Sequence, residues 1–268
     1  MSKTVFITGA STGIGKATAE LFLEQGWNVV ATMRNPQDDS PHDRKLVLRL
    51  DVVEGGSIEA AVQQAVERFG GIDVVVNNAG YALVGTFESM AEGQIKKQFD
   101  TNVFGLMRVC KAVLPHLRER GHGVIVNVAS MGGRLSFPFY SVYHGTKWAV
   151  DGFSESLSYE LEAVGVKVKI IEPGAIKTDF YDRSADFTHD TALTQYNAIV
   201  EQGMAKMNSA GKKGAPPSAV AKAIWQAATE DSARLRHVVG QDAKMMLWMR
   251  HLLGIGNFMK IIKSQLLK

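Results

Sequence analysis

Residues 5–26 read VFITGASTGIGKATAELFLEQG, and this stretch decides the fold. Its first four residues are apolar or β-branched and are typical of a buried strand. A glycine-rich turn follows at 9–15, and apolar residues then recur at helical spacing up to Gly26. Glycines let a phosphate approach the backbone closely, and the free N–H groups of a helix N-terminus bind anions. The stretch therefore predicts the strand–turn–helix unit of a nucleotide-binding α/β protein.

The same alternation of short apolar strands and longer amphipathic helices continues along the chain. We expect further strands at 28–33, 46–52, 72–80, 123–130 and 166–174, and helices at 57–69, 91–119 and 141–163. This alternation indicates an α/β fold in which a doubly wound parallel sheet carries helices on both faces. We predict one catalytic domain at 1–243 and an amphipathic tail at 244–268. The irregular stretch 179–215 is interpreted as a substrate lid, with a surface excursion as the alternative.

Composition and charge exclude several classes of protein. The 268 residues carry a net charge of +3, so nothing indicates nucleic-acid binding, and 46% of them are hydrophobic, as in globular proteins. No run of apolar residues is long enough for a membrane span, and the first strand begins too early for a secretory signal, so we expect a cytoplasmic protein. Cys110 falls in an apolar helical pattern typical of a buried thiol. The histidines lack metal-ligand spacing, so we predict no catalytic metal.

The turn and the ends of the next two strands predict the cofactor. We expect the pyrophosphate of a dinucleotide to bind at Gly9, Ser11, Thr12, Gly13, Ile14 and Gly15. The second strand ends in Thr32-Met33-Arg34, without the carboxylate that holds the ribose hydroxyls of NAD. Arg34 offers a planar cation suited to a phosphate, which favours NADP(H) over NAD(H); a solvated surface arginine is the alternative. At the end of the third strand, Asp51 is placed to reach the adenine and Val52 to pack on it.

Tyr143 and Lys147 form the pair that indicates acid–base chemistry. They lie four residues apart in a predicted helix and so share one face, and Tyr143 is the only tyrosine with a lysine at this spacing. A phenol has a reference pKa of about 10, and a nearby ammonium lowers that pKa by stabilising the phenolate. Ser130, at a strand end, supplies a hydroxyl for a substrate oxygen. Asn102 lies in a predicted helix interior, where asparagine is intrinsically poor, which suggests a functional role.

These motifs together resemble the short-chain dehydrogenase/reductase family over residues 4–180, and more loosely to about 242. TGASTGIG at 8–15 is similar to the cofactor turn of that family, and NNAG at 77–80 to the element that stabilises its central sheet. Pro173-Gly174 followed by Thr178 resembles the segment that holds the nicotinamide. Four residues match the catalytic tetrad: Asn102, Ser130, Tyr143 and Lys147.

The resemblance implies a single-domain Rossmann fold with seven parallel strands, a catalytic site at their carboxyl ends, and a homodimer or homotetramer. It also implies that Asn102 holds a water that links Lys147 to solvent. His144, at a position where smaller residues are frequent, and the tail beyond 243 depart from the family's pattern. The resemblance adds a set of cofactor contacts: Asn78, Ala79, Gly80, Tyr143, Lys147, Pro173, Gly174, Ile176 and Thr178.

The expected function is an oxidoreductase that transfers a hydride between NADP(H) and a carbonyl or secondary alcohol. Tyr143 would exchange the proton with the oxygen, while the cofactor exchanges the hydride with the carbon. The alternative is a regulator that senses NADP(H) without turnover, although such a protein has no need of Ser130, Tyr143 and Lys147 together. An epimerase or dehydratase is disfavoured, because relatives with that chemistry usually carry a different glycine spacing.

Apolar residues near the predicted site favour an apolar substrate such as a steroid, a retinoid or an aromatic ketone. Packing of the same side chains against the lid or the core is the alternative. Four of them follow Ser130 and two begin the predicted lid: Met131, Leu135, Phe137, Phe139, Tyr181 and Phe187.

The tail has the pattern of an amphipathic helix with basic residues off its apolar stripe. Such a helix rests on a membrane surface or docks on the pocket or a neighbouring subunit, and we favour docking. Gly254, Gly256 and Asn257 weaken any continuous helix. The stripe comprises Trp248, Leu252, Ile255, Met259, Ile262 and Leu266. The basic residues are Arg250, Lys260, Lys263 and Lys268.

Overall fold

The computed structural model describes residues 2–36, 41–177 and 185–267. Seven strands form one parallel sheet in the order β3-β2-β1-β4-β6-β7-β9, which confirms the predicted fold class. Their continuous apolar runs fit a sheet that is covered on both faces. In chain order the strands are β1 (Thr4–Thr8), β2 (Asn28–Met33), β3 (Lys45–Arg49), β4 (Val74–Asn77), β6 (Gly123–Val128), β7 (Val166–Pro173) and β9 (Arg236–Val239).

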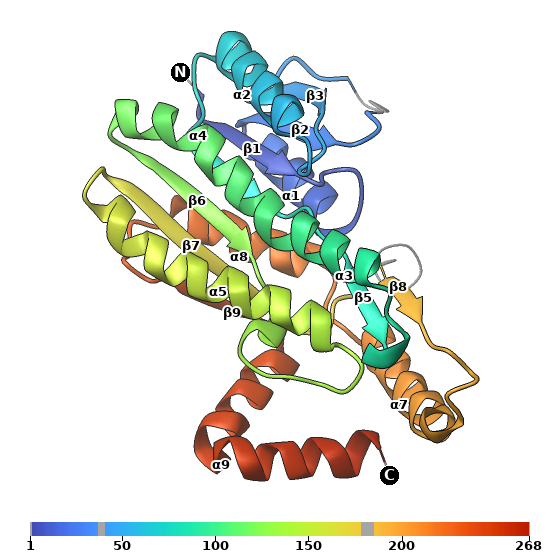
Figure 1. Cartoon of the computed structure of the whole chain (residues 1–268). Coiled ribbons are helices and arrows are strands. Elements are labelled where there is room, and N and C mark those ends of the chain that lie inside the picture. Colours follow the sequence, from blue (N-terminus) through green and yellow to red (C-terminus); the bar gives the residue numbers. More distant parts are fainter. Residues whose placement is uncertain (1, 37–40, 178–184, 268) are drawn as a thin grey trace.

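Helices cover both faces of the sheet (Figure 1). Phe22 and Ile224 bring α1 and α8 into the core on one face. Ala61, Val113 and Leu157 bring α2, α4 and α5 into the core on the other. Each helix buries a stripe of small or aliphatic side chains against the sheet, as the helical spacing predicts. The bounds are α1 (Gly13–Glu24), α8 (Pro217–Thr229), α2 (Gly55–Phe69), α4 (Leu106–Arg120) and α5 (Ser141–Glu162).

The strand order reverses between β1 and β4, where Val5 pairs with Val74. At such a reversal the chain connections leave on opposite faces of the sheet and open a crevice at the carboxyl ends of the strands, where α/β proteins bind their ligands. The glycine turn follows β1, and the NNAG segment begins at the last residue of β4. The topology therefore brings these two motifs to one crevice.

The helix predicted at 91–119 is interrupted, so the expectation of one regular helix is wrong. α3 (Glu92–Phe99) continues through a π-helical segment, η2 (Asp100–Gly105), into α4. The side chain of Asn102 lies in this segment and bonds to both backbone groups of Tyr81. Gly105 permits close contact with Val52, because a Cβ added there would lie 2.7 Å from a Val52 methyl carbon. These contacts with distant segments stabilise the wider turn, which is a frequent feature of functional sites.

The stretch 179–215 is more regular than expected where the structure describes it. β8 (Ala185–Thr188) pairs in parallel with β5 (Ala82–Gly85), and α7 (Thr194–Lys212) follows. The expectation of a stretch without a strand is therefore wrong. Two short 3-10 turns complete the described elements near this region, η1 (Phe87–Ser89) and η3 (Met131–Gly133). Thr178 and Tyr181 lie outside the described residues.

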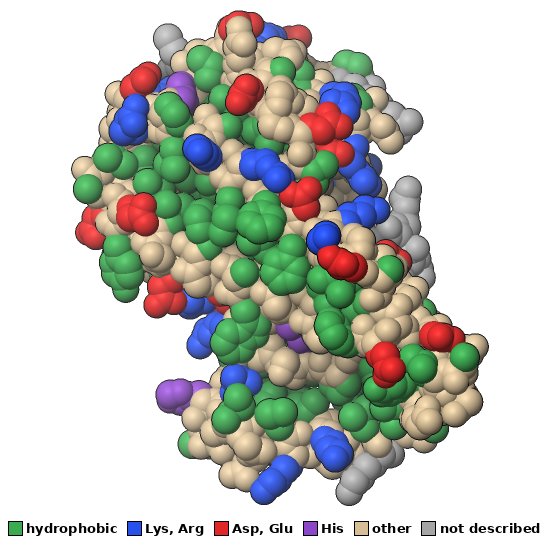
Figure 2. Space-filling view, viewed as in Figure 1, with side chains coloured by type: hydrophobic (Ala, Val, Ile, Leu, Met, Phe, Trp, Pro, Cys, Tyr) green, Lys and Arg blue, Asp and Glu red, His purple; other side chains and the backbone are tan. Residues whose placement is uncertain are grey.

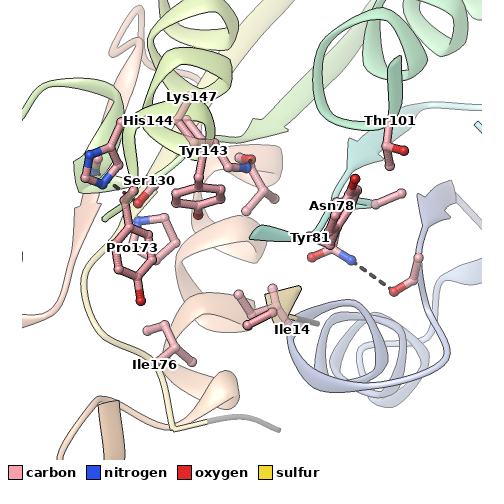
Figure 3. Close-up of a pocket in the computed structure, with 18 of the residues that line it drawn as sticks. Ile14, Asn78, Tyr81, Thr101, Ser130, Tyr143, His144, Lys147, Pro173 and Ile176 are labelled. Atoms are coloured by element: carbon pink, nitrogen blue, oxygen red, sulfur yellow. Dashed lines mark hydrogen bonds between the residues drawn. The ribbon is translucent and has the colours of Figure 1, made fainter. Parts of the chain in front are cut away.

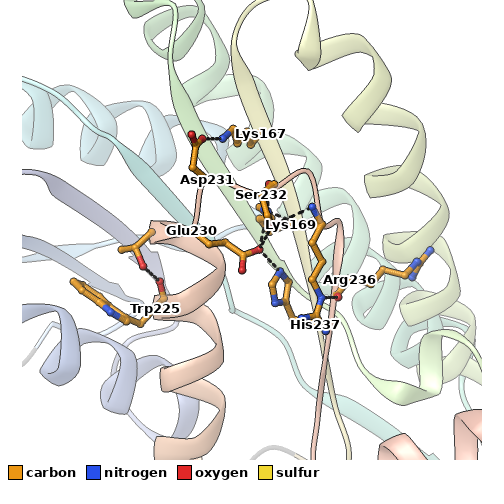
Figure 4. Close-up of polar contacts among 10 residues, drawn as sticks. Lys167, Lys169, Trp225, Glu230, Asp231, Ser232, Arg236 and His237 are labelled. Atoms are coloured by element: carbon orange, nitrogen blue, oxygen red, sulfur yellow. Dashed lines mark hydrogen bonds and ion pairs between the residues drawn. The ribbon is translucent and has the colours of Figure 1, made fainter.

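A buried lysine fixes the edge of the sheet beside β9 (Figure 4). Lys169 of β7 is 1% exposed, and its ammonium donates to Glu230 at 3.1 Å and to the carbonyls of Ser232 and Arg234 at 2.8 and 2.7 Å. A buried ammonium is tolerated only when its three donors are satisfied, and here they are. The loop between α8 and β9 is thereby held against the sheet. β9 itself was not recognised from the sequence pattern.

The tail forms α9 (Gln241–Leu266), in which two helical arms meet at a kink (Figure 1). Gly254 lies at the kink with φ 70° and ψ 165°, a conformation open to glycine. Phe258 and Ile262, in the second arm, are buried against Leu135. The prediction of one apolar stripe is wrong, because the kink divides it. Four of its six residues are exposed: Trp248, Leu252, Ile255 and Met259.

Candidate active site

One cavity of about 1530 Å³ lies at the carboxyl ends of the strands and brings the predicted site residues together. Gly15 and Asn102 do not line it, and Thr178 lies outside the described residues. The other predicted cofactor and catalytic residues all form part of its wall: Gly9, Ser11, Thr12, Gly13, Ile14, Arg34, Asp51, Val52, Asn78, Ala79, Gly80, Ser130, Tyr143, Lys147, Pro173, Gly174 and Ile176.

The glycine turn has the geometry of an anion-binding loop. Gly9 has φ +67°, and a Cβ added at Gly15 would lie 2.2 Å from the Gly9 carbonyl oxygen, so only glycine fits there. The amide of Asn78 donates to the carbonyls of Thr8 and Gly9, both at 3.0 Å, and so holds the turn against the NNAG segment. Gly15 thus allows the turn to close, and its direct contact with the cofactor stays a prediction.

The N-terminus of α1 is free to bind an anion. Its capping residue, Thr12, makes no side-chain hydrogen bond to the helix, and the first turn carries no acidic residue. The N–H groups of a first helical turn have no partner within the helix, and the helix dipole adds partial positive charge. Because Thr12, Gly13 and Ile14 line the cavity, these donors fit the pyrophosphate of a dinucleotide.

Buried amides hold the sheet beneath the site. Asn77 of β4 donates to the side-chain oxygen of Asn127 on β6 at 2.9 Å, and Asn127 donates to the Ser154 hydroxyl on α5 at 2.8 Å. Asn77 also contacts the sulfur of Cys110 at 3.3 Å. Burial raises the pKa of Cys110 to about 12, so this thiol is an inert core group, as the sequence pattern indicates.

At the far end of the cavity, Arg34 and Asp51 lie at the ends of neighbouring strands. Arg34 follows β2 and is exposed, and its side chain lines the cavity. The carboxylate of Asp51 accepts from the Val53 N–H at 3.2 Å. Val52 is buried and packs on Gly105 while still forming part of the cavity wall. Arg34, Asp51 and Val52 therefore lie in the same cavity wall, and their contacts with the adenosine part of a cofactor stay predictions.

Ser130, Tyr143 and Lys147 converge on the opposite part of the cavity (Figure 3). Ser130 follows β6, and its hydroxyl accepts from the Gly132 N–H at 3.0 Å. Tyr143 and Lys147 are on the first two turns of α5, and the ammonium of Lys147 lies 5.7 Å from the centre of the tyrosine ring. The same ammonium donates to the Val128 carbonyl at 2.9 Å, which fixes its position.

Buried charges behind Lys147 shape the electrostatics of the site. Burial lowers the pKa of Lys147 to about 8, while the charge of Asp151, one turn further along α5, opposes this shift. Burial and the nearby Glu172 raise the pKa of Asp151 to about 7. Arg236 lies 3.2 Å from the carboxylate of Asp151 and 2.6 Å from that of Glu172, and Arg134 lies 3.2 Å from Glu172. The pKa of Lys147 therefore lies well below that of an ordinary lysine.

Asn102 has a structural task that the sequence did not reveal. Its amide nitrogen donates to the Tyr81 carbonyl at 2.8 Å and to the Thr146 hydroxyl at 3.2 Å, and its oxygen accepts from the Tyr81 N–H at 3.1 Å. Both amide hydrogens are therefore engaged by protein. The side chain ties η2 to α5, one residue before Lys147. The water link between Asn102 and Lys147 stays a prediction.

Two residues of the cavity wall were missed as site residues. His144 accepts from the Phe137 N–H through Nδ1 at 3.2 Å, and burial lowers its pKa to about 4, so the neutral ring carries its proton on Nε2. Asp242, at the start of α9, accepts from the Ala175 N–H at 2.7 Å and so ties the tail to the Pro173-Gly174 segment. An acidic residue in the first turn of a helix is too common to signal this contact.

The residues predicted to bind substrate divide into two groups. Met131 and Phe137 line the cavity, whereas Leu135 is buried against α9. Phe139 packs on α7, where a Cβ added at Gly203 would lie 2.4 Å from its ring, and Phe187 is exposed. Leu135 and Phe139 therefore pack against other parts of the protein, as the alternative predicted, and Phe187 lies on the surface. Further wall residues come from β5–β8, α7 and α9: Ala185, Asp186, Lys206, Met207, Met246, Ile262 and Leu266.

Among the described residues, no cluster of three or more histidine, cysteine or carboxylate side chains is arranged to hold a metal ion. Independence from metal stays a prediction. No helix in the described part of the chain is both long enough and apolar enough to cross a membrane.

The chain matches the family model of short chain dehydrogenases over residues 3–188. This chain belongs to the short-chain dehydrogenase family. An uncharacterized oxidoreductase of Schizosaccharomyces pombe is 37% identical over 237 residues, which cover 87% of this chain and 99% of the relative. The crystal structure of a short-chain dehydrogenase from Streptomyces avermitilis matches with a TM-score of 0.84 and 34% identity, covering 98% of this chain and 95% of that one.

Two further relatives of this short-chain dehydrogenase have more specific names. A Bacteroides thetaiotaomicron protein named 3-ketodihydrosphingosine reductase is 40% identical over 178 residues, which cover 66% of this chain and 65% of the relative. The structure of ElxO with NADP bound has a TM-score of 0.73 and 29% identity, covering 89% of this chain and 96% of that one. The protein is thus an oxidoreductase of this family.

Proposed function

We propose that this short-chain dehydrogenase is an NADP(H)-dependent carbonyl reductase or alcohol dehydrogenase that acts on an apolar substrate. The observation that carries the proposal is that Ser130, Tyr143 and Lys147 line the same cavity as the glycine turn and the Pro173-Gly174 segment. A protein that only bound the dinucleotide would have no use for a hydroxyl, a phenol and an amine converging there.

The bound dinucleotide would supply the hydride to the carbonyl carbon. Tyr143 donates its hydroxyl proton to the carbonyl oxygen, which becomes the alcohol and leaves a phenolate on the tyrosine. The ammonium of Lys147 stabilises this phenolate, since its position is fixed near the ring by the Val128 carbonyl. The hydroxyl of Ser130 donates a hydrogen bond to the substrate oxygen as negative charge develops on it. Oxidation of an alcohol runs these steps in reverse.

The preference for NADP(H) rests on Arg34. It is exposed at the end of β2, it lines the cavity, and a guanidinium matches the geometry of a phosphate. Similarity to known structures does not decide between NADP(H) and NAD(H). The structure of ElxO contains NADP, whereas a short-chain dehydrogenase from Burkholderia phymatum was solved in complex with NAD.

We expect Arg34→Ala to lower kcat/KM for NADPH about tenfold and to leave kcat/KM for NADH nearly unchanged, because only NADPH loses a charge-assisted hydrogen bond. Steady-state kinetics with both cofactors measures the ratio. Arg49→Ala is the matched control, since Arg49 ends the next strand, is outside the cavity wall and pairs with Glu54 at 2.9 Å. An equal fall in kcat/KM with NADPH and with NADH would contradict the proposal that Arg34 selects NADP(H).

The pKa of Lys147 predicts how reduction depends on pH. Burial brings that pKa to about 8, so the ammonium is present below this pH and is lost as the pH rises through it. We therefore expect kcat/KM for ketone reduction to fall above about pH 8, because the phenolate then loses its neighbouring positive charge. In Lys147→Arg the cation persists to higher pH, so the alkaline limb should move upward even if the maximum rate is lower. If the fall in kcat/KM at alkaline pH occurs at the same pH in Lys147→Arg, it reports the titration of another group.

The apolar part of the cavity supports an apolar ketone. Met131, Phe137 and Met207 line the cavity from three different segments, and Ile262 and Leu266 of α9 add to the same apolar wall. A relative is named 3-ketodihydrosphingosine reductase. We infer a substrate in which an alkyl or fused-ring group lies against this wall. Location in the cytoplasm and assembly into a homodimer or homotetramer belong to the same proposal.

A panel of ketones with NADPH tests the proposed function. Reduction is followed as loss of the nicotinamide absorbance, and the panel runs from a short methyl ketone to long-chain and fused-ring ketones. We expect kcat/KM to rise with apolar size. Turnover confined to small polar ketones would contradict the apolar specificity but not the chemistry.

A further inference from the structure

The kink in α9 leaves a group of large apolar side chains exposed on the outside of the molecule. We call residues 251–257, all of which are exposed, the corner of α9. Its apolar members and those beside it are between 36% and 63% exposed. They are Met245, Trp248, Leu252, Leu253, Ile255 and Met259. Single exposed hydrophobic residues are ordinary, but six on one helix mark a surface that binds something apolar.

The corner is not the side by which α9 binds the rest of the protein. That side is formed by Met246, Phe258 and Ile262, which pack with Met131 and Leu135 near the cavity. α9 therefore carries apolar side chains on two sides, one buried and one exposed. Figure 2 shows the lobe of α9 set off from the body by a hollow, with hydrophobic and basic side chains on its surface.

The charge around the corner is positive. α9 contains four Lys and Arg residues and one acidic residue, Asp242. The carboxylate of Asp242 is turned toward the body, where it accepts from the Ala175 N–H at 2.7 Å. The guanidinium of Arg250 lies 5.6 Å from the centre of the Trp148 ring. The outer surface thus combines apolar side chains with three lysines that pair with no carboxylate within the described part of the chain. The basic residues are Lys244, Arg250, Lys260 and Lys263.

We propose that the corner of α9 inserts into the surface of an anionic phospholipid bilayer and anchors the protein there peripherally. Leu252, Leu253 and Ile255 would enter the boundary between headgroups and acyl chains, while the exposed lysines of α9 contact lipid phosphates. Gly254 lies between these three exposed side chains, at the bend where the two arms of α9 meet (Figure 1).

A second copy of the chain fits this surface less well. A two-fold contact through the corner would bring the same basic patch of both subunits together, including Lys260 and Lys263 of each. Facing like charges oppose association, whereas anionic headgroups neutralise them. The corner also needs a matching groove in a protein partner but none in a deformable lipid surface.

The anchoring has a consequence for the cavity. The second arm of α9 begins at the corner, and its residues Ile262 and Leu266 form part of the cavity wall. A corner held in lipid brings this wall close to the bilayer surface, where an apolar substrate is dissolved. This consequence rests on the proposed function, but the anchoring itself does not.

Sedimentation with vesicles tests the proposal on the full chain, without cofactor or substrate. We expect the protein to bind vesicles of equal parts phosphatidylcholine and phosphatidylglycerol, and to bind pure phosphatidylcholine at least tenfold more weakly. Added salt should release it, because the headgroup attraction is screened. Leu252→Asp with Ile255→Asp should lower binding at least tenfold, and Lys260→Glu with Lys263→Glu should abolish the preference for anionic lipid.

Tyr159→Asp is the matched control, because Tyr159 is 73% exposed on α5, away from the corner. It should bind vesicles as the unaltered protein does. Circular dichroism and NADPH binding show that each variant is folded. Protein that stays in solution with anionic vesicles at low salt would overturn the proposal. An equal loss of vesicle binding in Tyr159→Asp would also overturn it. A third contrary result is an unaltered protein that binds no vesicles and is a dimer in light scattering, while Leu252→Asp with Ile255→Asp is a monomer.

Discussion

Tyr143→Phe should lower kcat for ketone reduction roughly 10²- to 10⁴-fold, because it removes the hydroxyl that delivers the proton. The ring remains and keeps its contacts with Tyr140 and His144, whose ring centres lie 6.0 and 5.8 Å away. The thermal midpoint and the affinity for NADPH should therefore stay close to those of the unaltered protein. Steady-state kinetics, thermal melts and a fluorescence titration with NADPH measure the three quantities.

Tyr140→Phe is the matched control for this substitution. Tyr140 lines the same cavity and stacks on His144, with ring centres 5.6 Å apart. Loss of its hydroxyl should change kcat far less than loss of the Tyr143 hydroxyl. Comparable losses in the two variants would mean that the rate depends on the shape of the aromatic cluster and not on a proton from Tyr143.

Gly15→Ala should weaken NADPH binding on the order of 10²-fold, because a displaced turn no longer presents its donors to the pyrophosphate. The added methyl carbon would lie 2.2 Å from the Gly9 carbonyl oxygen and 2.6 Å from the amide nitrogen of Asn78. That amide bonds to the Thr8 and Gly9 carbonyls, so relief of the clash moves the whole turn. Overpacking of this kind costs about 1–3 kcal/mol of stability. Calorimetry gives both the affinity and the unfolding midpoint.

Gly152→Ala separates this effect from a general effect of glycine replacement. Gly152 lies inside α5, and a Cβ added there meets nothing within 4 Å. Alanine should stabilise the helix by about 0.5–1 kcal/mol and leave NADPH affinity unchanged. Unchanged affinity in Gly15→Ala as well would contradict a cofactor site at the glycine turn.

The central sheet was predictable because its signals are local. The strand at 5–9 and the glycine turn define the first unit, and the periodicity of 13–26 and 141–163 gives helices that the structure contains. The spacing of Tyr143 and Lys147 put them on one face of a helix, and the resemblance to the family added Ser130 to the same site. The structure assembles all three on one cavity.

The errors occur where contacts between distant segments override local pattern. The π-helical segment at Asp100–Gly105 depends on bonds from Asn102 to Tyr81, and β8 exists only because it pairs with β5, about a hundred residues earlier. The kink at Gly254 divides the predicted tail stripe, so that four of its residues are exposed while Ile262 and Leu266 line the cavity. In the same way, Leu135 was expected beside substrate, but α9 covers it. None of these contacts leaves a periodic signal in the sequence.

Deuterium transfer tests the central claim most directly. NADPH carrying deuterium at the transferable position of the nicotinamide is incubated with the protein and the best ketone of the panel, and the alcohol is analysed by mass spectrometry. We predict that the label appears on the carbinol carbon with the unaltered protein, and that Tyr143→Phe forms this product at least about 10²-fold more slowly. Tight binding of NADPH with no label in any alcohol product would contradict the account and indicate a protein that senses the cofactor without turnover.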